Sequence, residues 1–197
     1  PATGKRRSTT AGMTNGPATR WYGNRRRRFW LLLAGLTVCA FLLRLAVCAE
    51  LSGIRSVVAP WSGTDMATYK QTAAEIANGQ WPEKFYYQPF YYAVFLPVLY
   101  LVFGVGVWPV LFTQALLGAG TVWLTGVTGA RFFGRRAGLV AAMLLAFSQF
   151  HIFYTPFLLI AVLQGFWLVL ILWLVLRAHD TRKQTWWAAA AAATGCA

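Results

Sequence analysis

The stretch from residue 29 to residue 48, FWLLLAGLTVCAFLLRLAVC, decides the class of fold to which this chain belongs. It contains a single charged side chain, Arg44. A helix of about 20 apolar residues crosses the ~30 Å hydrocarbon core of a bilayer and satisfies its own backbone hydrogen bonds there. The run therefore predicts a transmembrane helix.

Further apolar runs support the same conclusion. They occupy residues 109–130, 137–154 and 157–176, and another begins at about 186 and continues to 197. Charged residues make up 12% of the chain and the mean hydropathy is +0.51, whereas soluble domains carry about a quarter charged residues. The sequence predicts an all-α, polytopic transmembrane helical bundle, integral to the cell membrane.

The strong positive charge fits a membrane protein better than a nucleic-acid-binding one. The net charge is +13, and eight of the 18 basic residues lie in the first 28 positions. No nucleic-acid recognition motif accompanies this charge. Basic residues beside apolar runs are typical of contacts with anionic lipid headgroups. We therefore expect no nucleic-acid partner, and we expect residues 1–28 to form a disordered cytoplasmic tail.

Three basic clusters, at residues 20–28, 131–136 and 177–183, set the predicted topology. The positive-inside rule places all three in the cytoplasm, which requires an even number of crossings between neighbours. Residues 89–107 contain two prolines and two glycines, so we expect this segment to lie along the outer interface. Residues 49–108 then form one large external loop that hugs the membrane. The alternative is a spanning helix at 89–107, with one basic cluster outside.

Four of the five carboxylates of the chain lie in or just before this loop, at Glu50, Asp65, Glu75 and Glu83. Residues 64–79 predict a short helix that either Thr64 or Asp65 caps and that Gly79 ends. Its apolar side chains recur at helical spacing and predict one face for the membrane surface: Met66, Tyr69, Ala73 and Ile76. On these patterns alone, Asp65 is either a helix cap or a carboxylate at a water–membrane boundary.

An aromatic run, FYYQPFYY at residues 85–92, follows this helix. It is either an aromatic belt at the headgroups or a binding platform whose rings stack on a ligand. Arg55 and Lys84 lie in the same loop and are candidates to pair with a phosphate. Arg44 either snorkels, pairs with Glu50, or marks a functional site that contacts a phosphate.

Three motifs in this order carry a resemblance to a known family: GTDMATYKQTAAEIANGQWP at 63–82, FYYQPFYYAVFLPVLYLVFG at 85–104, and RFFGRRAGLVAAMLLAFSQF at 131–150. Together they resemble the polyprenyl-phosphate-sugar-dependent glycosyltransferases of the GT-C fold. The likeness is to bacterial relatives of protein O-mannosyltransferases and of the lipid A aminoarabinose transferase. It covers residues 29–176.

The resemblance implies that Asp65 is the catalytic base, on an external loop. The base takes a proton from an acceptor hydroxyl that attacks a mannose-like sugar on a polyprenyl phosphate. The acceptor would be a glycan, lipid or protein. In some relatives this carboxylate instead helps to bind a divalent cation, Mg²⁺ or Mn²⁺. The residues expected to bind the donor phosphate or sugar are Arg44, Arg55, Tyr69, Lys84, Tyr86, Tyr87 and Gln88.

The chain departs from the family pattern at two positions. Met66 follows Asp65 where some relatives have a glutamate, and Ala161 stands where several have an acidic residue. The second departure favours the alternative function, a non-catalytic scaffold or lipid-binding subunit. His151 and Tyr154 are the nearest polar substitutes. A transporter is disfavoured because transporters usually show polar or broken helices near the midplane and repeated halves, and only Gln114 and Gln164 offer a feature of that kind.

The ends of the chain suggest a longer protein. The sequence begins at Pro1 and finishes within an apolar run. We therefore expect residues 29–197 to be the N-terminal part of a GT-C-like domain, and we expect this part alone to be inactive.

Overall fold

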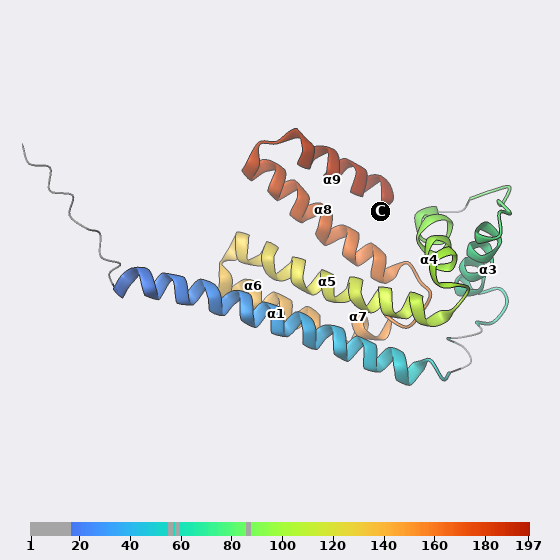
Figure 1. The fold of residues 1–197 in the computed structure, drawn as a ribbon, viewed down its shortest axis with the longest axis horizontal. Helices are drawn as coiled ribbons and strands as arrows, with labels where there is room; N and C mark the ends of the chain where they lie inside the picture. The colour runs from blue at the N-terminus through green and yellow to red at the C-terminus, as the bar shows by residue number, and fades with distance from the viewer. Residues whose placement is uncertain (1–16, 55–56, 58–59, 86–87) are drawn as a thin grey trace, which may run out of the picture.

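The structure is a computed structural model that describes residues 17–54, 57, 60–85 and 88–197. The described residues form helices and no strands. Three helices are long and apolar enough to cross a membrane: α1 (Pro17–Leu51), in its part from Arg26 onward, α5 (Val107–Phe133) and α8 (Ala161–Thr181). The predicted all-α membrane bundle is confirmed (Figure 1).

Shorter helices complete the described fold. They are α3 (Asp65–Ala77), the π-helical turn η1 (Phe90–Phe95), α4 (Leu96–Phe103), α6 (Arg135–Ala146), α7 (Gln149–Phe153) and α9 (Gln184–Cys196). Helices α1, α5 and α8 run alongside one another, and α9 folds back on α8 (Figure 1). Helices α3 and α4 lie together at one end of this bundle (Figure 1).

Helices α1 and α5 pack antiparallel. The Trp30 and Trp123 ring centroids are 5.6 Å apart near one end, and those of Phe41 and Phe112 are 5.5 Å apart towards the other. Between them the Leu33 side chain occupies the space where Gly126 has no side chain. The hydrophobic effect does not drive helices together within lipid, so membrane helices depend on close van der Waals packing of this kind for their association.

Helices α5 and α6 approach still more closely through glycine. A methyl group on Gly138 would collide with the backbone of Gly126 and Ala130, at 2.5 Å from the Ala130 nitrogen. Gly134, with φ of +87°, forms the turn between the two helices. The FGRRAG sequence at 133–138 therefore allows helices α5 and α6 to form a tight helical hairpin.

The basic clusters gather at one end of the bundle. Arg131, in the last turn of α5, forms an ion pair of 2.7 Å with Asp180, near the end of α8. The first basic cluster directly precedes the apolar part of α1. The contact between Trp30 and Trp123 places the start of that apolar part beside the second half of α5. Helices α3 and α4 lie at the opposite end (Figure 1). The basic clusters therefore lie at one end of the described fold, and the membrane topology and its sidedness stay predictions.

Several boundaries differ from the sequence predictions. Helix α1 begins at Pro17, so residues 17–28 are helical rather than disordered; arginine is a good helix former, and the apolar helix extends into the basic run. Residues 1–16 lie outside the described part. The expected span at 137–154 is divided into α6 and α7, and α8 starts at residue 161 instead of 157.

The segment at 89–107 contains only short helices. Its turns η1 and α4 comprise six and eight residues, or roughly 21 Å at ~1.5 Å per residue. This length falls short of a ~30 Å hydrocarbon core. Gly104, with φ of +81°, ends α4 before α5 begins. The fold is therefore compatible with the predicted interfacial position of this segment.

Helix α3 matches the helix predicted at 64–79. Its four buried residues are the predicted apolar face: Met66, Tyr69, Ala73 and Ile76. At its C-terminus the Gly79 N–H donates to Ile76 O and the Gln80 N–H donates to Glu75 O, each at 2.9 Å. With Gly79 at φ +82°, these bonds form a Schellman motif.

Candidate active site

The N-terminus of α3 leaves the Asp65 carboxylate available. Thr64 is the cap: its backbone is extended, and its Oγ1 accepts a hydrogen bond from Ala67 N at 3.4 Å. Asp65 is the first residue of the helix and is exposed. The interpretation of Asp65 as the cap is therefore wrong. The positive end of the helix dipole stabilises an ionised carboxylate at this position.

Asp65 lies in a pocket with a volume of about 340 Å³. The lining residues are Asp65, Thr68, Tyr69, Thr72, Pro82, Lys84 and Tyr92. The structure thus brings together three of the predicted site residues, Asp65, Tyr69 and Lys84. It adds Thr68 and Thr72, which sequence reasoning missed. Their spacing in the sequence could have identified them, because residues three, four and seven positions after Asp65 lie on the same face of a helix as Asp65.

The back wall of this pocket is aromatic. The Tyr69 and Tyr92 rings are stacked, with centroids 5.4 Å apart and planes 5° from parallel, and Tyr91 meets Tyr69 edge-on at 5.6 Å. All three side chains are buried. The apolar face of α3 therefore packs on the aromatic segment. The prediction that this face rests on the membrane was wrong, because nearby tyrosines within the chain cover it.

Of the remaining predicted phosphate and sugar contacts, the two that the structure describes, Arg44 and Gln88, do not line this pocket. Gln88 has a φ of +54° and lies against a narrow gap that Tyr91, Leu163 and Gln164 also line. Arg55, Tyr86 and Tyr87 lie outside the described residues. Their predicted roles stay predictions.

Arg44 is buried, with no exposed surface. Its Nη1 donates to Ala40 O at 3.0 Å and to Ala146 O at 3.4 Å, and its Nη2 donates to Leu145 O at 3.3 Å. Nη2 also lies 3.3 Å from His151 Nδ1. Arg44 therefore neither snorkels nor pairs with Glu50.

These contacts account for four of the five guanidinium N–H groups. The fifth, on Nε, has no partner among the described residues and packs against Gly118. Leu145 and Ala146 are at the C-terminal end of α6, where the backbone carbonyls have no partner within the helix. Arg44 supplies donors to that helix end from α1. In this arrangement a phosphate would have to displace an existing contact to reach its guanidinium.

Gln114 is a second buried polar residue, and sequence reasoning gave it no role in a site. Its Oε1 accepts a hydrogen bond from the Tyr91 hydroxyl at 2.9 Å. Its Nε2 donates to Thr155 O at 2.7 Å and to Phe157 O at 2.9 Å. Gln114 thus ties the aromatic wall to α5 and to the loop before α8. No local pattern in the sequence identifies these partners.

The donor set beside Asp65 does not form a metal site by itself. Among the described residues, no three His, Cys, Asp or Glu side chains come together. Asp65 is the one carboxylate on the pocket lining, and Lys84 already places a positive charge there. Resident Mg²⁺ sites usually combine one or two carboxylates with substrate phosphates.

Comparison with known proteins identifies the family. A family model described as dolichyl-phosphate-mannose-protein mannosyltransferase matches residues 87–197, more than half of the chain. The match includes α5 to α9 and begins after α3, so it does not include Asp65. No curated protein and no solved structure matches the chain significantly. The chain belongs to the dolichyl-phosphate-mannose-protein mannosyltransferase family.

Proposed function

We propose that the full protein transfers a mannose-like sugar from a polyprenyl-phosphate donor to an acceptor hydroxyl, in the pocket beside Asp65. The family supports glycosyltransferase chemistry in a membrane. The observation that carries the proposal is the composition of the pocket, where a carboxylate, a lysine and two threonines surround a cavity of about 340 Å³. The acceptor is a glycan, a lipid or a protein.

Asp65 acts as the general base. It accepts the proton of the acceptor hydroxyl while the acceptor oxygen forms a bond to the anomeric carbon. The bond from that carbon to the phosphate oxygen breaks, and the polyprenyl phosphate leaves with the electron pair. A phosphate needs no protonation to leave, unlike the alcohol in glycoside hydrolysis, where a second carboxyl group is required. One carboxylate is therefore sufficient.

Lys84 binds the phosphate of the donor. Its ammonium group is a compact positive charge on the same pocket as Asp65, and lysine commonly binds phosphates in this way. Thr68 and Thr72 offer hydroxyls to the sugar, and Tyr92 limits the pocket on the aromatic side. Because Lys84 already balances phosphate charge, we expect transfer to persist in excess EDTA.

The position of α3 supports an extracytoplasmic site. The basic clusters and the Arg131–Asp180 ion pair lie at one end of the bundle, and α3 lies at the other (Figure 1). Clusters of basic residues favour the cytoplasmic side. We accordingly place the N-terminus in the cytoplasm and the pocket outside the plasma membrane.

The test is sugar transfer in membranes that contain the protein as the cell makes it, with polyprenyl-phosphate mannose as the first donor. Asp65→Asn should lower kcat at least a hundredfold, since it removes the base and preserves its size. Glu75→Gln is the matched control, because Glu75 lies on the same helix and does not line the pocket. Equal transfer by wild type and Asp65→Asn would show that the base lies elsewhere.

A second candidate function is a non-catalytic scaffold or lipid-binding subunit. Ala161 favours it, because this alanine lines a pocket beside His151 at the position where the family resemblance leads us to expect an acidic residue. If the complete, folded protein transfers sugar from none of the polyprenyl-phosphate donors tested, this candidate replaces the first.

A further inference from the structure

The basic side chains of the described residues are concentrated at one end of the bundle. Nine of them are exposed there: Arg26, Arg27, Arg28, Arg131, Arg135, Arg136, Arg177, Arg182 and Lys183. Asp180 is the one carboxylate of the chain at this end, so nine positive charges and one negative charge give a formal charge of +8. The other four carboxylates lie between residues 50 and 83.

These basic side chains lie at the depth of lipid headgroups. They occupy or directly follow the terminal turns of the three helices that can cross a membrane. Outward from the contact between Trp30 and Trp123, Arg28 is two residues away and Arg131 is eight residues away, or roughly 3 Å and 12 Å along the helix axes. Trp30 and Phe133 are exposed at the same end, and aromatic and basic side chains together are typical of the membrane interface.

Two tight turns lie side by side at this end (Figure 1). Helices α5 and α6 are joined at Gly134, and helices α8 and α9 are joined at Arg182 and Lys183. The ion pair between Arg131 and Asp180, with a distance of 2.7 Å, links the two hairpins directly before their turns. The cations in and after the two turns are therefore gathered on one surface.

Most of these cations have no partner within the described part of the chain. Arg131 pairs with Asp180, and the Arg177 Cζ atom lies 5.8 Å from the centroid of the Trp186 ring. The side chains of the other seven form no hydrogen bond or ion pair with a described residue. Like charges that lie close together repel one another, and an anionic partner relieves this repulsion.

Arg182 has a backbone conformation that favours a different residue. Its φ is +56°, in the left-handed region that glycine and asparagine adopt most readily. Its N–H donates to Ala178 O at 2.9 Å and so closes the end of α8. Glycine would form the same backbone bond without the steric cost. The turn therefore does not require an arginine side chain, which leaves the guanidinium available to a partner outside the chain.

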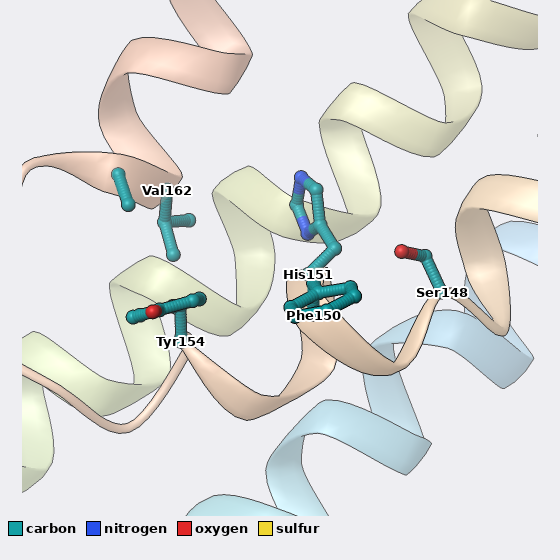
Figure 2. A pocket seen from close by; sticks show the side chains of 6 residues that line it. Ser148, Phe150, His151, Tyr154 and Val162 are labelled. Atoms are coloured by element: carbon teal, nitrogen blue, oxygen red, sulfur yellow. The ribbon is translucent and has the colours of Figure 1, made fainter.

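The pockets described above offer no comparable positive charge. Figure 2 shows Ser148, His151 and Tyr154 on the α7 segment, where the described pocket lining includes no lysine or arginine. The Asp65 pocket has one lysine on its described lining, together with the Asp65 carboxylate. A headgroup with a net negative charge is therefore attracted most strongly to the basic end.

We propose that this basic end binds the headgroups of anionic phospholipids. The headgroup phosphates accept hydrogen bonds from Arg135 and Arg136 at one turn and from Arg182 and Lys183 at the other. Clusters of roughly four to eight basic residues beside a membrane-spanning helix are typical of sites for such lipids. An acidic protein is less favoured, because the terminal turns of membrane-spanning helices lie against lipid. The site is distant from the Asp65 pocket and does not depend on the proposed transfer activity.

Binding is measured by native mass spectrometry on the protein as the cell makes it, purified in dodecyl maltoside. The probes are dioleoylphosphatidylglycerol, which is anionic, and dioleoylphosphatidylcholine, which has the same acyl chains and no net charge. Phosphatidylglycerol should bind at least about ten times more tightly. An oligoglutamate peptide is the third probe. If it binds as tightly as phosphatidylglycerol, the surface suits an acidic protein and the lipid proposal is wrong.

Variants of the basic residues locate the site. Arg182→Gly should weaken phosphatidylglycerol binding about fivefold, with unchanged or higher thermal stability, because glycine adopts this φ without steric cost. Arg182→Lys retains the charge and should bind nearly as tightly as wild type. Replacement of both Arg135 and Arg136 by glutamine should weaken binding more than about tenfold. Lys84→Gln is the matched control, because it removes one charge at the opposite end of the fold and should leave the affinity unchanged.

Three further results would overturn the proposal: equal affinities for phosphatidylglycerol and phosphatidylcholine, wild-type affinity in both Arg182→Gly and the Arg135 and Arg136 double variant, or a loss in Lys84→Gln as large as that in Arg182→Gly. The last result would place the lipid in the Asp65 pocket. Thermal unfolding in the same detergent accompanies each measurement, so that a loss of binding in a variant of wild-type stability cannot be attributed to unfolding.

Discussion

Replacement of Gln114 by leucine tests whether its hydrogen bonds hold the aromatic wall in place. Gln114 is fully buried and bonds to the Tyr91 hydroxyl, Thr155 O and Phe157 O. Leucine has a similar volume and forms none of these bonds. Phe157 O would retain the Leu159 N–H as a donor at 2.8 Å. The Tyr91 hydroxyl and Thr155 O would lose their recorded partners.

The expected cost follows from those two groups. A buried polar group without a partner costs about 1–3 kcal/mol, so Gln114→Leu should lower the free energy of unfolding by roughly 3 kcal/mol. Tyr91→Phe leaves Gln114 Oε1 without a donor and should cost about 1–2 kcal/mol. In the double variant both the Gln114 amide and the Tyr91 hydroxyl are absent, so neither is left without its partner. The coupling energy should lie between about 0.6 and 1.7 kcal/mol, the mean and upper values measured for membrane helices.

The assay is reversible unfolding of the chain by sodium dodecyl sulfate in mixed micelles, followed by tryptophan fluorescence. Gln164→Leu makes the same chemical change on an exposed face of α8 and should alter stability by less than about 0.5 kcal/mol. The reasoning fails if the Gln114 and Tyr91 substitutions are additive within about 0.3 kcal/mol, or if Gln114→Leu behaves like Gln164→Leu.

Other predictions concern single contacts. Gly138→Ala should destabilise the α5–α6 hairpin by about 3 kcal/mol or more, because the obstructing atoms are backbone; the same unfolding assay should show almost no effect of Gly35→Ala. Thr64→Ala should cost about 1 kcal/mol of helix stability and Thr64→Ser little, seen as faster amide hydrogen exchange in α3 alone. Arg44→Lys keeps the charge and loses the planar fork of donors, so it should cost about 2 kcal/mol in the unfolding assay; wild-type stability would show that the charge alone suffices. Sugar transfer should persist in excess EDTA, and loss that Mg²⁺ or Mn²⁺ restores would establish a metal requirement.

The sequence predicted α3 well because its determinants are local. A threonine cap, a glycine at the end and apolar residues at helical spacing act within one helix, and the structure has all of them at the expected positions. The long apolar helices follow from the same kind of short-range pattern, because length and composition determine whether a helix can span a bilayer. The clustering of Asp65 with Lys84 was also expected from their common loop.

Contacts between distant parts of the chain could not be predicted in this way. Arg44 and His151 are 107 positions apart, and Gln114 meets Thr155 across 41 positions. A polar residue in an apolar run shows that a partner is needed, and it does not show which carbonyl will be nearby. The prediction that the apolar face of α3 lies on the membrane was wrong for the same reason, since Tyr91 and Tyr92 cover that face.

The buried polar side chains and the exposed carboxylate have different physical explanations. The segment at 137–154 breaks between α6 and α7, and the C-terminal end of each helix leaves carbonyls that lipid cannot satisfy. Arg44 donates to two carbonyls at the end of α6, and Gln114 donates to two carbonyls in the loop after α7. Both residues therefore supply hydrogen-bond donors at the break in the helix. Asp65 makes no recorded hydrogen bond or ion pair with another described residue, and Thr64 already caps its helix. The helix dipole favours a carboxylate in this first turn, and the position of Asp65 on the pocket leaves it available for the role of base that we propose.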